Sequence, residues 1–191
     1  MHLSSPRIPP LADHDLTDAQ RAAIKPVSQG PLGPLNIFRT LAHAPEALSA
    51  FLAWGSYVLS KKNALSPRDR ELIILRIGFL CRSGYEWAQH TDIGLRAGLN
   101  AEEIARIKQG ADAPGWSDSE AALLAACDEL HGRHFISDAT WARLTAHFTQ
   151  KQCMDAVFTA GQYTQVSMML NTFGVQLDAG LPLDPDLDAR P

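Results

Sequence analysis

The sequence lacks long apolar runs and long basic runs, and both absences limit its function. No stretch approaches the roughly 20 consecutive apolar residues that span a bilayer, and residues 1–7 lack the apolar core of a signal peptide. The net charge of −4 and the pI near 5.9 argue against nucleic acid or an anionic membrane as a partner. We therefore expect a cytoplasmic protein that binds small molecules or other proteins.

Cysteine is also scarce. Cys81, Cys127 and Cys153 are odd in number and lie 46 and 26 residues apart. Neither a disulfide framework nor a zinc site fits this spacing. We expect three buried thiols and no metal centre.

Strand signals are nearly absent, whereas signals for the start of a helix recur. Each start pairs a serine, threonine or asparagine with a glutamine or acidic residue three positions later, and apolar residues at helical spacing follow. These pairs are Thr17 with Gln20, Ser66 with Asp69, Asn100 with Glu103, Ser117 with Glu120, and Thr149 with Gln152. The pattern predicts an all-α fold of seven or eight helices.

The length of 191 residues and the 46% hydrophobic content fit one globular domain. The ends are rich in proline and aspartate, which predicts an extended N-terminal arm at 1–16, a helical domain at 17–178 and a C-terminal tail at 179–191. Glycine and proline predict loops at 29–34 and 111–116. A helical run begins near Leu35.

Three potential proton carriers interrupt the apolar run between residues 70 and 90. They are Glu71, Glu86 and His90. Glu86 and His90 lie four residues apart, so on a helix their side chains project within roughly 40° of each other and can share a proton or a ligand. This pair is the first candidate for chemistry.

The helix predicted from Pro67 to about Arg82 is apolar nearly all round between residues 72 and 80. Only Arg76 and Gly78 interrupt it. Such a helix is buried on all sides, and in a small domain we expect a neighbouring subunit to cover it, which predicts a homo-oligomer. Arg76 would then need an anionic partner, either Glu71, Glu86 or a substrate carboxylate.

Residues 66–103 resemble the carboxymuconolactone decarboxylase and alkylhydroperoxidase D (AhpD) superfamily. The pattern of that superfamily is a glutamate early in one helix and a C-x-x-C-x-x-x-H element that opens the next. Glu71 and His90 match its glutamate and histidine, whereas Ser83 and Glu86 stand where the peroxidase branch has its two cysteines. The resemblance implies an AhpD-like helical bundle that assembles as a trimer or hexamer.

The missing cysteines bear on the reaction. Thiol peroxidase chemistry needs one thiolate to attack and a second thiol to resolve the product, and Cys81 is a lone thiol near this element. The Glu-x-x-x-His that remains resembles the decarboxylase branch. The resemblance then implies loss of CO2 from a small unsaturated lactone acid, or a related proton shift, without metal or organic cofactor.

His90 is the expected acid/base, because the unperturbed pKa of histidine is about 6.5. Glu86 would orient the ring and stabilise its cation, and Glu71 would relay the proton or fix the tautomer. The expected substrate contacts are Tyr85, Arg76, Arg82 and Cys81, with the two arginines reserved for a carboxylate.

Four other interpretations stay open. Ser83 and Glu86 have the spacing of a capping box, which would give Glu86 a structural role. Cys81 could serve a degenerate thiol peroxidase. Asp128-Glu-Leu-His131, with His134 beyond it, could ligate a metal, although a solvated helix end explains these residues as well. Finally, the chain could be a non-catalytic oligomeric binding protein that keeps the fold.

Overall fold

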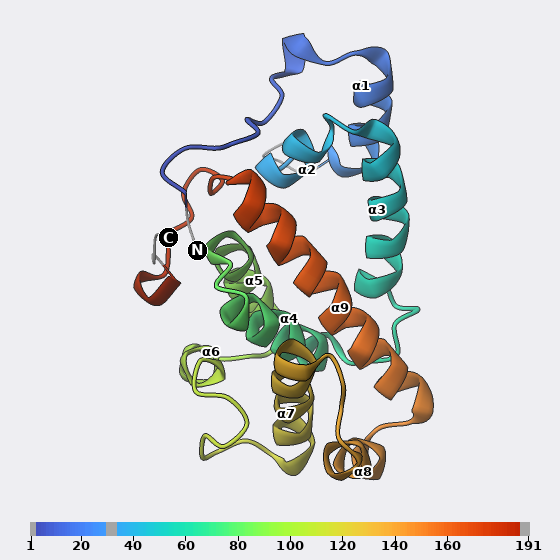
Figure 1. The fold of residues 1–191 in the computed structure, drawn as a ribbon, viewed down its shortest axis with the longest axis vertical. Coiled ribbons are helices and arrows are strands. Elements are labelled where there is room, and N and C mark those ends of the chain that lie inside the picture. The colour runs from blue at the N-terminus through green and yellow to red at the C-terminus, as the bar shows by residue number, and fades with distance from the viewer. Residues whose placement is uncertain (1–2, 30–33, 188–191) are drawn as a thin grey trace.

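The structure, a computed structural model, describes residues 3–29 and 34–187. Over these ranges the chain forms α-helices and short 3-10 turns without a β-strand, which confirms the all-α prediction (Figure 1). The α-helices are α1 (Asp18–Ile24), α2 (Asn36–Leu41), α3 (Pro45–Leu59), α4 (Pro67–Leu80), α5 (Gly84–Arg96), α6 (Ala101–Ile107), α7 (Asp118–Arg133), α8 (Asp138–His147) and α9 (Gln150–Phe173). No helix among them has the length and apolar character needed to cross a membrane.

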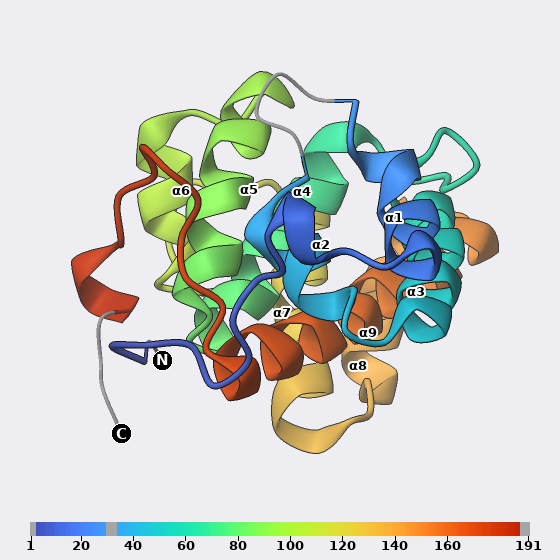
Figure 2. The same cartoon turned by 90° about the horizontal axis from the view of Figure 1, so that it is seen from above.

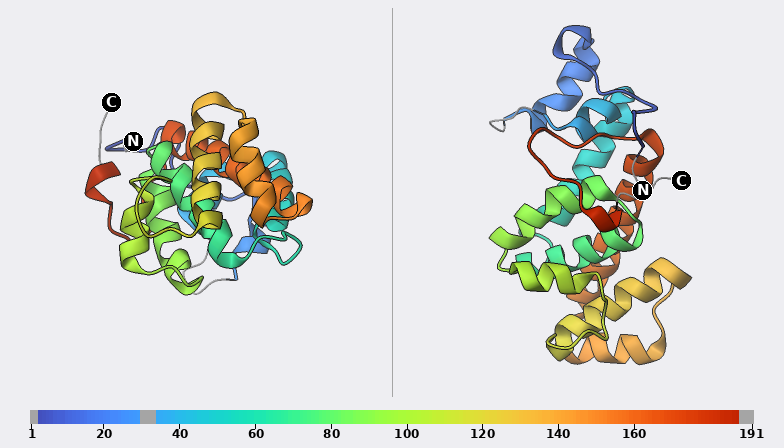
Figure 3. Two further views of the ribbon diagram at one scale, coloured as in Figure 1. Left: turned by 90° about the horizontal axis from the view of Figure 1, so that it is seen from below. Right: turned by 90° about the vertical axis from the view of Figure 1, so that its left-hand side faces the viewer.

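The long helix α9 organises the molecule. It runs obliquely through the bundle, with α3 on one side and the α4–α5 pair on the other, while α1 and α2 lie at one end and α6, α7 and α8 at the other (Figures 1 and 3). Helix α4 packs against α5, α7 and α9, so it is the central element of the core. Residues of α2, α3, α5 and α9 line a common cavity. Figure 2 shows the arrangement of the helices from above.

The helix starts predicted from sequence are present. Thr17, Asn100, Ser117 and Thr149 each form a complete capping box with the residue three positions later. Ser66 accepts a hydrogen bond from the Asp69 amide, and Pro67 occupies the first turn of α4. These caps satisfy backbone N–H groups that have no partner within the helix, which is why they could be recognised locally.

The chain has more helices than expected, because the run predicted from Leu35 is divided. α2 ends at Leu41, and α3 begins at Pro45. A proline disfavours helical geometry in the residue before it, and Ala44 accordingly has φ −126° and ψ 78°. The predicted 111–116 loop separates α6 from α7. Residues 30–33 of the predicted 29–34 loop lie outside the described part of the chain.

The burial of α4 corrects one step of the sequence argument. Leu72, Ile74, Leu75 and Ile77 are fully buried inside a single chain. Neighbouring helices of the same chain therefore cover the apolar surface that we had assigned to a second subunit. The homo-oligomer remains a prediction, but the burial of α4 no longer argues for it.

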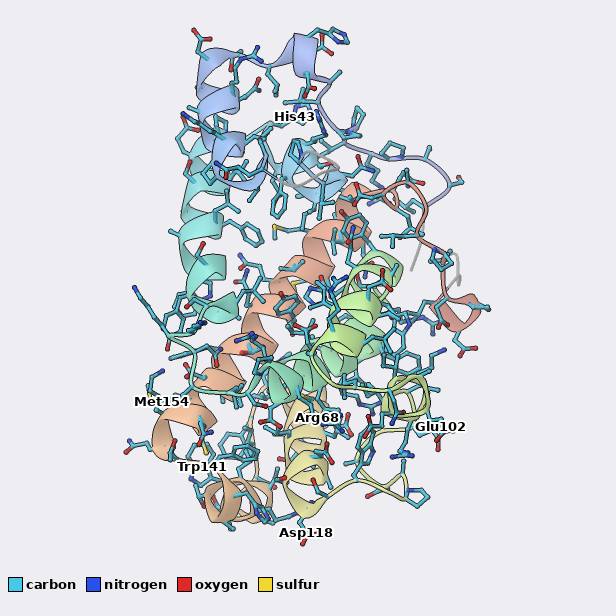
Figure 4. The ribbon with its side chains drawn as sticks, turned by 180° about the vertical axis from the view of Figure 1, so that it is seen from behind. His43, Arg68, Glu102, Asp118, Trp141 and Met154 are labelled. Atoms are coloured by element: carbon cyan, nitrogen blue, oxygen red, sulfur yellow. The ribbon has the colours of Figure 1, made fainter. Side chains whose placement is uncertain are left out.

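Ion pairs join α4 to α6 and α7, and they join the end of α6 to the C-terminal segment. Arg68, labelled in Figure 4, pairs with Glu103 of α6 and Glu120 of α7. Lys108 pairs with Asp184 and Asp186 of the C-terminal segment. These contacts hold α6, α7 and the C-terminal segment around the α4–α5 pair.

Candidate active site

The site begins at the tight turn between α4 and α5. α4 ends at Leu80, Arg82 adopts a left-handed conformation with φ 53°, and the Ser83 amide donates to the Gly78 carbonyl at 2.8 Å. Gly78 permits the close approach of the two helices, because a Cβ there would lie 3.2 Å from Cγ of Glu86. The turn thus brings Glu86 and His90 of α5 against α4.

Glu71, His90 and Glu86 form a continuous chain of polar contacts. Nδ1 of His90 lies 2.6 Å from Oε2 of Glu71, and Nε2 lies 3.1 Å from Oε1 of Glu86. All three side chains are buried, and the ring of Tyr163 contacts the imidazole edge-on with 5.0 Å between ring centroids. The sequence predicted these three residues, and the structure places them together.

Burial and mutual charge shift the protonation of this chain. Burial raises the pKa of Glu86 to about 7, with His90 opposing the shift and Glu71 adding to it. Burial alone would lower the pKa of His90, but the nearby Glu86 carboxylate and the hydrogen bond that His90 donates to Glu71 outweigh it, so the pKa of His90 is raised. The surroundings therefore favour the protonated imidazole, and Glu86 titrates near neutral pH.

The chain opens on a cavity of about 500 Å³. Its polar lining comes from Arg70, Glu71, Glu86, Gln89, His90 and Gln162, together with the phenols Tyr85 and Tyr163 and with Ser56. The rest of its wall is mainly apolar and belongs to α2, α3, α5 and α9, with Val27 and Leu35 beside them. Such a cavity suits a small molecule of mixed polarity.

Tyr85 lies in the cavity wall, as predicted. Its hydroxyl donates to Oδ2 of Asp178, and the Gln89 amide donates to the same oxygen at 2.6 Å. The other carboxylate oxygen of Asp178 accepts the backbone N–H of Asn36 at 2.9 Å. Tyr85 therefore fastens the C-terminal segment and α2 to α5 at the edge of the cavity.

The prediction that Arg76 contacts substrate is corrected. Its Nε donates to Oδ1 of Asp128 at 2.6 Å, and its Nη1 donates to the carbonyls of Ile107 and Lys108. Arg76 is not part of the cavity lining. Its anionic partner is a residue of α7 rather than Glu71, Glu86 or a substrate, and its role is to join α4 to α6 and α7.

Arg82 and Cys81 are also absent from the cavity lining. Arg82 is exposed in the turn after α4, because the left-handed backbone there directs the chain back toward α5. The thiol of Cys81 is half-buried and lies 3.6 Å from Nδ1 of His131, on the far side of the turn, and burial raises its pKa. The predicted substrate contacts of Arg82 and Cys81 are revised accordingly.

The predicted capping box at Ser83 is wrong. The Ser83 side chain makes no capping hydrogen bond at the start of α5. The Ser83 amide already donates to Gly78, so it is not available to Glu86, whose carboxylate instead reaches His90. Glu86 belongs to the polar chain.

The residues at the end of α7 that could have ligated a metal form contacts with other parts of the protein. Asp128 pairs with Arg76, and Glu129 accepts hydrogen bonds from Ser137 and Thr140 at the start of α8. His134 ends α7 in a left-handed conformation, with its ring 3.2 Å from the Leu130 carbonyl. These contacts account for the polar residues at the end of α7.

The sequence argument left several polar cavity residues out of the predicted site, among them Arg70, Gln89, Gln162 and Tyr163. Arg70 directly precedes Glu71, and that adjacency was the only local signal for it. Gln162 and Tyr163 are 72 or more residues beyond His90, and nothing in their spacing on α9 separates them from ordinary packing residues.

Comparisons with known proteins agree with this fold. Residues 45–129, from α3 to α7, match the carboxymuconolactone decarboxylase family. No curated protein matches the sequence. A peroxidase-related protein from Ralstonia eutropha, described as an alkylhydroperoxidase AhpD core, superposes with a TM-score of 0.79 at 22% identity, over 91% of this chain and 93% of its own.

Two further solved structures share the fold. One is a protein of unknown function from Agrobacterium tumefaciens, described as an AhpD antioxidant defence protein, with a TM-score of 0.68, 22% identity and coverage of 73% of this chain and 95% of its own. The other is the debrominase Bmp8 with 2,3,4-tribromopyrrole, with a TM-score of 0.76, 12% identity and coverage of 92% and 94%.

The helical bundle with its buried carboxylate–imidazole chain defines an AhpD-like all-α protein. The family match covers Glu71, Glu86 and His90. Residues 45–129 of this chain are similar to the carboxymuconolactone decarboxylase family, and the described part of the chain has the AhpD-like fold that its sequence predicted.

Proposed function

We propose that the protein is a cofactor-independent lyase or isomerase that transfers a proton at a carbon atom of a small, anionic, lactone-type metabolite. The observation that carries this proposal is the buried chain from Glu71 through His90 to Glu86, which ends at a cavity with mainly apolar walls. General acid/base catalysis is most effective when the pKa lies near the working pH. The pKa of Glu86, about 7, meets this condition.

Each residue has a distinct role in the proposed step. Loss of CO2 from an unsaturated lactone acid breaks one C–C bond, and its electron pair passes into the conjugated lactone carbonyl to give a dienolate. Glu86 then donates its proton to carbon and becomes a carboxylate, which adjacent cationic His90 stabilises. His90 reprotonates Glu86 and regains its proton from solvent water, which supplies the one proton consumed per turnover, while Glu71 holds the imidazole by its Nδ1. In the related proton shift, the same carboxylate removes the proton that is later returned.

The apolar wall supports this chemistry. A carboxylate or enolate loses its hydration when it enters such a cavity. Its stability then depends on the few charged residues of the wall, and their electrostatic interactions are stronger there than in water. Glu71, Glu86 and His90 are all buried, and their interactions are weakly screened by solvent.

A thiol-dependent reaction has less support. None of the three cysteines belongs to the cavity lining. Burial raises the pKa of the Cys81 thiol, and this disfavours the thiolate that such chemistry needs. The turnover experiment below distinguishes the proposed enzyme from a non-catalytic binding protein.

The test is spectrophotometric turnover of unsaturated lactone acids that carry one or two carboxylates. Wild type is compared with His90→Ala and with His147→Ala, which removes an exposed histidine at the end of α8. We expect turnover to fall by roughly 10²–10⁴ in His90→Ala and to be unchanged in His147→Ala. Equal turnover in wild type and His90→Ala would reject the proposal, and ligand binding without turnover in all three proteins would favour the binding role.

A further inference from the structure

Arg70 is a cation of the cavity wall that has no anionic partner among the described residues. Its Nη1 makes one long hydrogen bond, 3.4 Å from the Ser60 carbonyl, and its Nε is buried without a partner. In the part of the chain that the structure describes, Arg70 forms no ion pair. A buried guanidinium nitrogen without an acceptor is costly, and a bound anion would relieve that cost.

The other arginines near the site are already satisfied or lie elsewhere. Arg68 pairs with Glu103 and Glu120, and Arg76 pairs with Asp128. Arg82 is exposed outside the cavity. Among the lining residues, Arg70 is therefore the one permanently charged cation that is free to bind a ligand.

The charges of the cavity nearly balance before a ligand arrives. Glu71 and His90 form one contact pair, in which the protonated imidazole is favoured, and Glu86 holds a proton for part of the time at neutral pH. Arg70 adds one positive charge. One ligand carboxylate would neutralise that charge, whereas a second carboxylate would lie near Glu71 and Glu86 without a cation of its own.

The remaining wall requires an apolar body on the ligand. It is formed by Val27, Leu35, Ile37, Phe38, Phe51, Leu52, Val58, Leu59, Ile93 and Val166. A second polar contact is offered by Gln162, which is buried and whose side-chain oxygen has no donor among residues 3–29 and 34–187. This amide can receive a hydroxyl or N–H group of the ligand.

We propose that Arg70 is the carboxylate-binding residue of the cavity, and that the cavity selects monocarboxylates with an apolar body over dicarboxylates and over neutral analogues. This inference rests on the proposed acid/base function of the same site and narrows its substrate class. Because Arg70 stabilises the carboxylate it holds, that carboxylate remains in the product, so the proton shift is the reaction that suits such a substrate.

Isothermal titration calorimetry with three related probes tests the inference without turnover. The probes are 3-phenylpropanoate with one carboxylate, 3-phenylpropanamide with none and 2-phenylsuccinate with two. We expect wild type to bind the monocarboxylate at least about tenfold more tightly than either of the others, as an ion pair in a partly buried site can provide.

The variants are Arg70→Gln, Arg70→Lys and Arg96→Gln, the last removing an exposed arginine of α5 that does not line the cavity. Arg70→Gln should weaken 3-phenylpropanoate binding by about tenfold or more and leave the amide unaffected. Arg70→Lys should recover part of the loss, which separates recognition of charge from a folding defect. Arg96→Gln should bind like wild type.

Three results would overturn the inference: a monocarboxylate affinity no better than that of the amide, including no heat for either; equal binding of 2-phenylsuccinate; or unchanged binding in folded Arg70→Gln. His90→Ala tests the proposed function alone, because its readout is turnover, whereas the binding preference is measured in wild type and the Arg70 variants. Binding selectivity together with no His90-dependent turnover would reject the function and leave Arg70 as the anion site.

Discussion

Glu86 and Asp155 are both buried carboxylates, yet their surroundings give them opposite properties. Asp155 of α9 accepts hydrogen bonds from the Tyr57 hydroxyl at 2.6 Å, the Ala64 amide at 2.7 Å and the Lys151 ammonium at 2.7 Å. Burial alone would raise the pKa of Asp155, but these three donors together lower it. Within residues 3–29 and 34–187 the carboxylate of Glu86 has its polar contact with His90 alone, and its pKa is raised to about 7.

The difference is one of donor number rather than depth. A carboxylate with several donors is held as an anion and links the elements that provide them, here α3, the α3–α4 loop and α9. A carboxylate with one titratable neighbour keeps a proton that it can release. The donors around Asp155 indicate a structural role, and the surroundings of Glu86 are consistent with the proposed acid/base role.

The largest expected effect is a loss of turnover when Glu86 is replaced by a residue that cannot transfer a proton. Glu86→Gln keeps the shape of the side chain but cannot donate or accept the proton, so turnover should fall by roughly 10²–10⁴. Asp155→Asn is the matched control at the other carboxylate and should retain most of the turnover per folded molecule. Steady-state kinetics at equal folded concentration measures both, and a similar loss in the two variants would erase the distinction.

The free energy of unfolding should be affected more by substitution of Asp155 than by substitution of Glu86. Asp155→Ala leaves three donors without their acceptor and should cost about 2–4 kcal/mol. For a chain of this size the melting temperature should fall by roughly 5–15 °C, measured by circular dichroism. Glu86→Gln should melt close to wild type near neutral pH. A larger loss of stability in Glu86→Gln than in Asp155→Ala would mean that Glu86 is a structural carboxylate.

The pH dependence of stability gives a smaller effect with a defined sign. The pKa of Glu86 is raised from 4.5 to about 7, so the folded protein keeps a proton that the unfolded chain releases within this window. The contribution of Glu86 is therefore present below about pH 4.5 and is lost as the pH rises through about 7. His90, whose pKa is also raised, acts in the same direction.

Denaturant unfolding of wild type and Glu86→Gln over this range isolates the contribution of Glu86. Wild type should lose stability relative to the variant as the pH rises, by a few kcal/mol at most. The difference between the two proteins cancels the titration of other carboxylates. A constant difference across the range would show that the pKa of Glu86 is not raised.

The smallest expected change in turnover is that of the Cys81→Ser variant. Cys81→Ser alters a half-buried thiol outside the cavity, so turnover of the lactone acids should change less than about twofold. A peroxide-consumption assay provides the contrasting measurement, because any thiol peroxidase activity would depend on this residue. Peroxide turnover that disappears in Cys81→Ser would favour the thiol mechanism over the proton chain.

Local patterns explain what the sequence predicted well. The caps at Thr17, Asn100, Ser117 and Thr149 involve residues three positions apart, and Glu86 and His90 are four apart on one helix. Glu71 joins them across a short turn. Interactions within a helix, or between helices joined by a short turn, depend on few unknown distances, so the central polar chain could be identified before the fold was known.

Long-range packing explains what the sequence could not predict. Whether Arg70, Arg76 or Arg82 faces the cavity depends on Asp128, which is 52 residues beyond Arg76, and on the turn at Arg82. The cavity wall joins α2 and α3 to α9 across more than 100 residues. The burial of α4 by its own chain likewise depends on α7 and α9, so the sequence pattern alone assigned it wrongly to a second subunit.

The three contacting polar residues lie on one helical hairpin, and this affects how proteins that share the fold can differ in their substrates. Glu71, Glu86 and His90 all belong to α4 and α5, whereas most of the apolar wall belongs to α2, α3 and α9. Under the proposed function, the acid/base residues and the carboxylate-binding Arg70 share this hairpin, whereas the shape of the apolar wall is determined mainly by other stretches of the chain. Mutations in α2 and α3 can exchange one substrate for another while the proton-transferring residues stay as they are, so relatives with the same hairpin need not share a substrate.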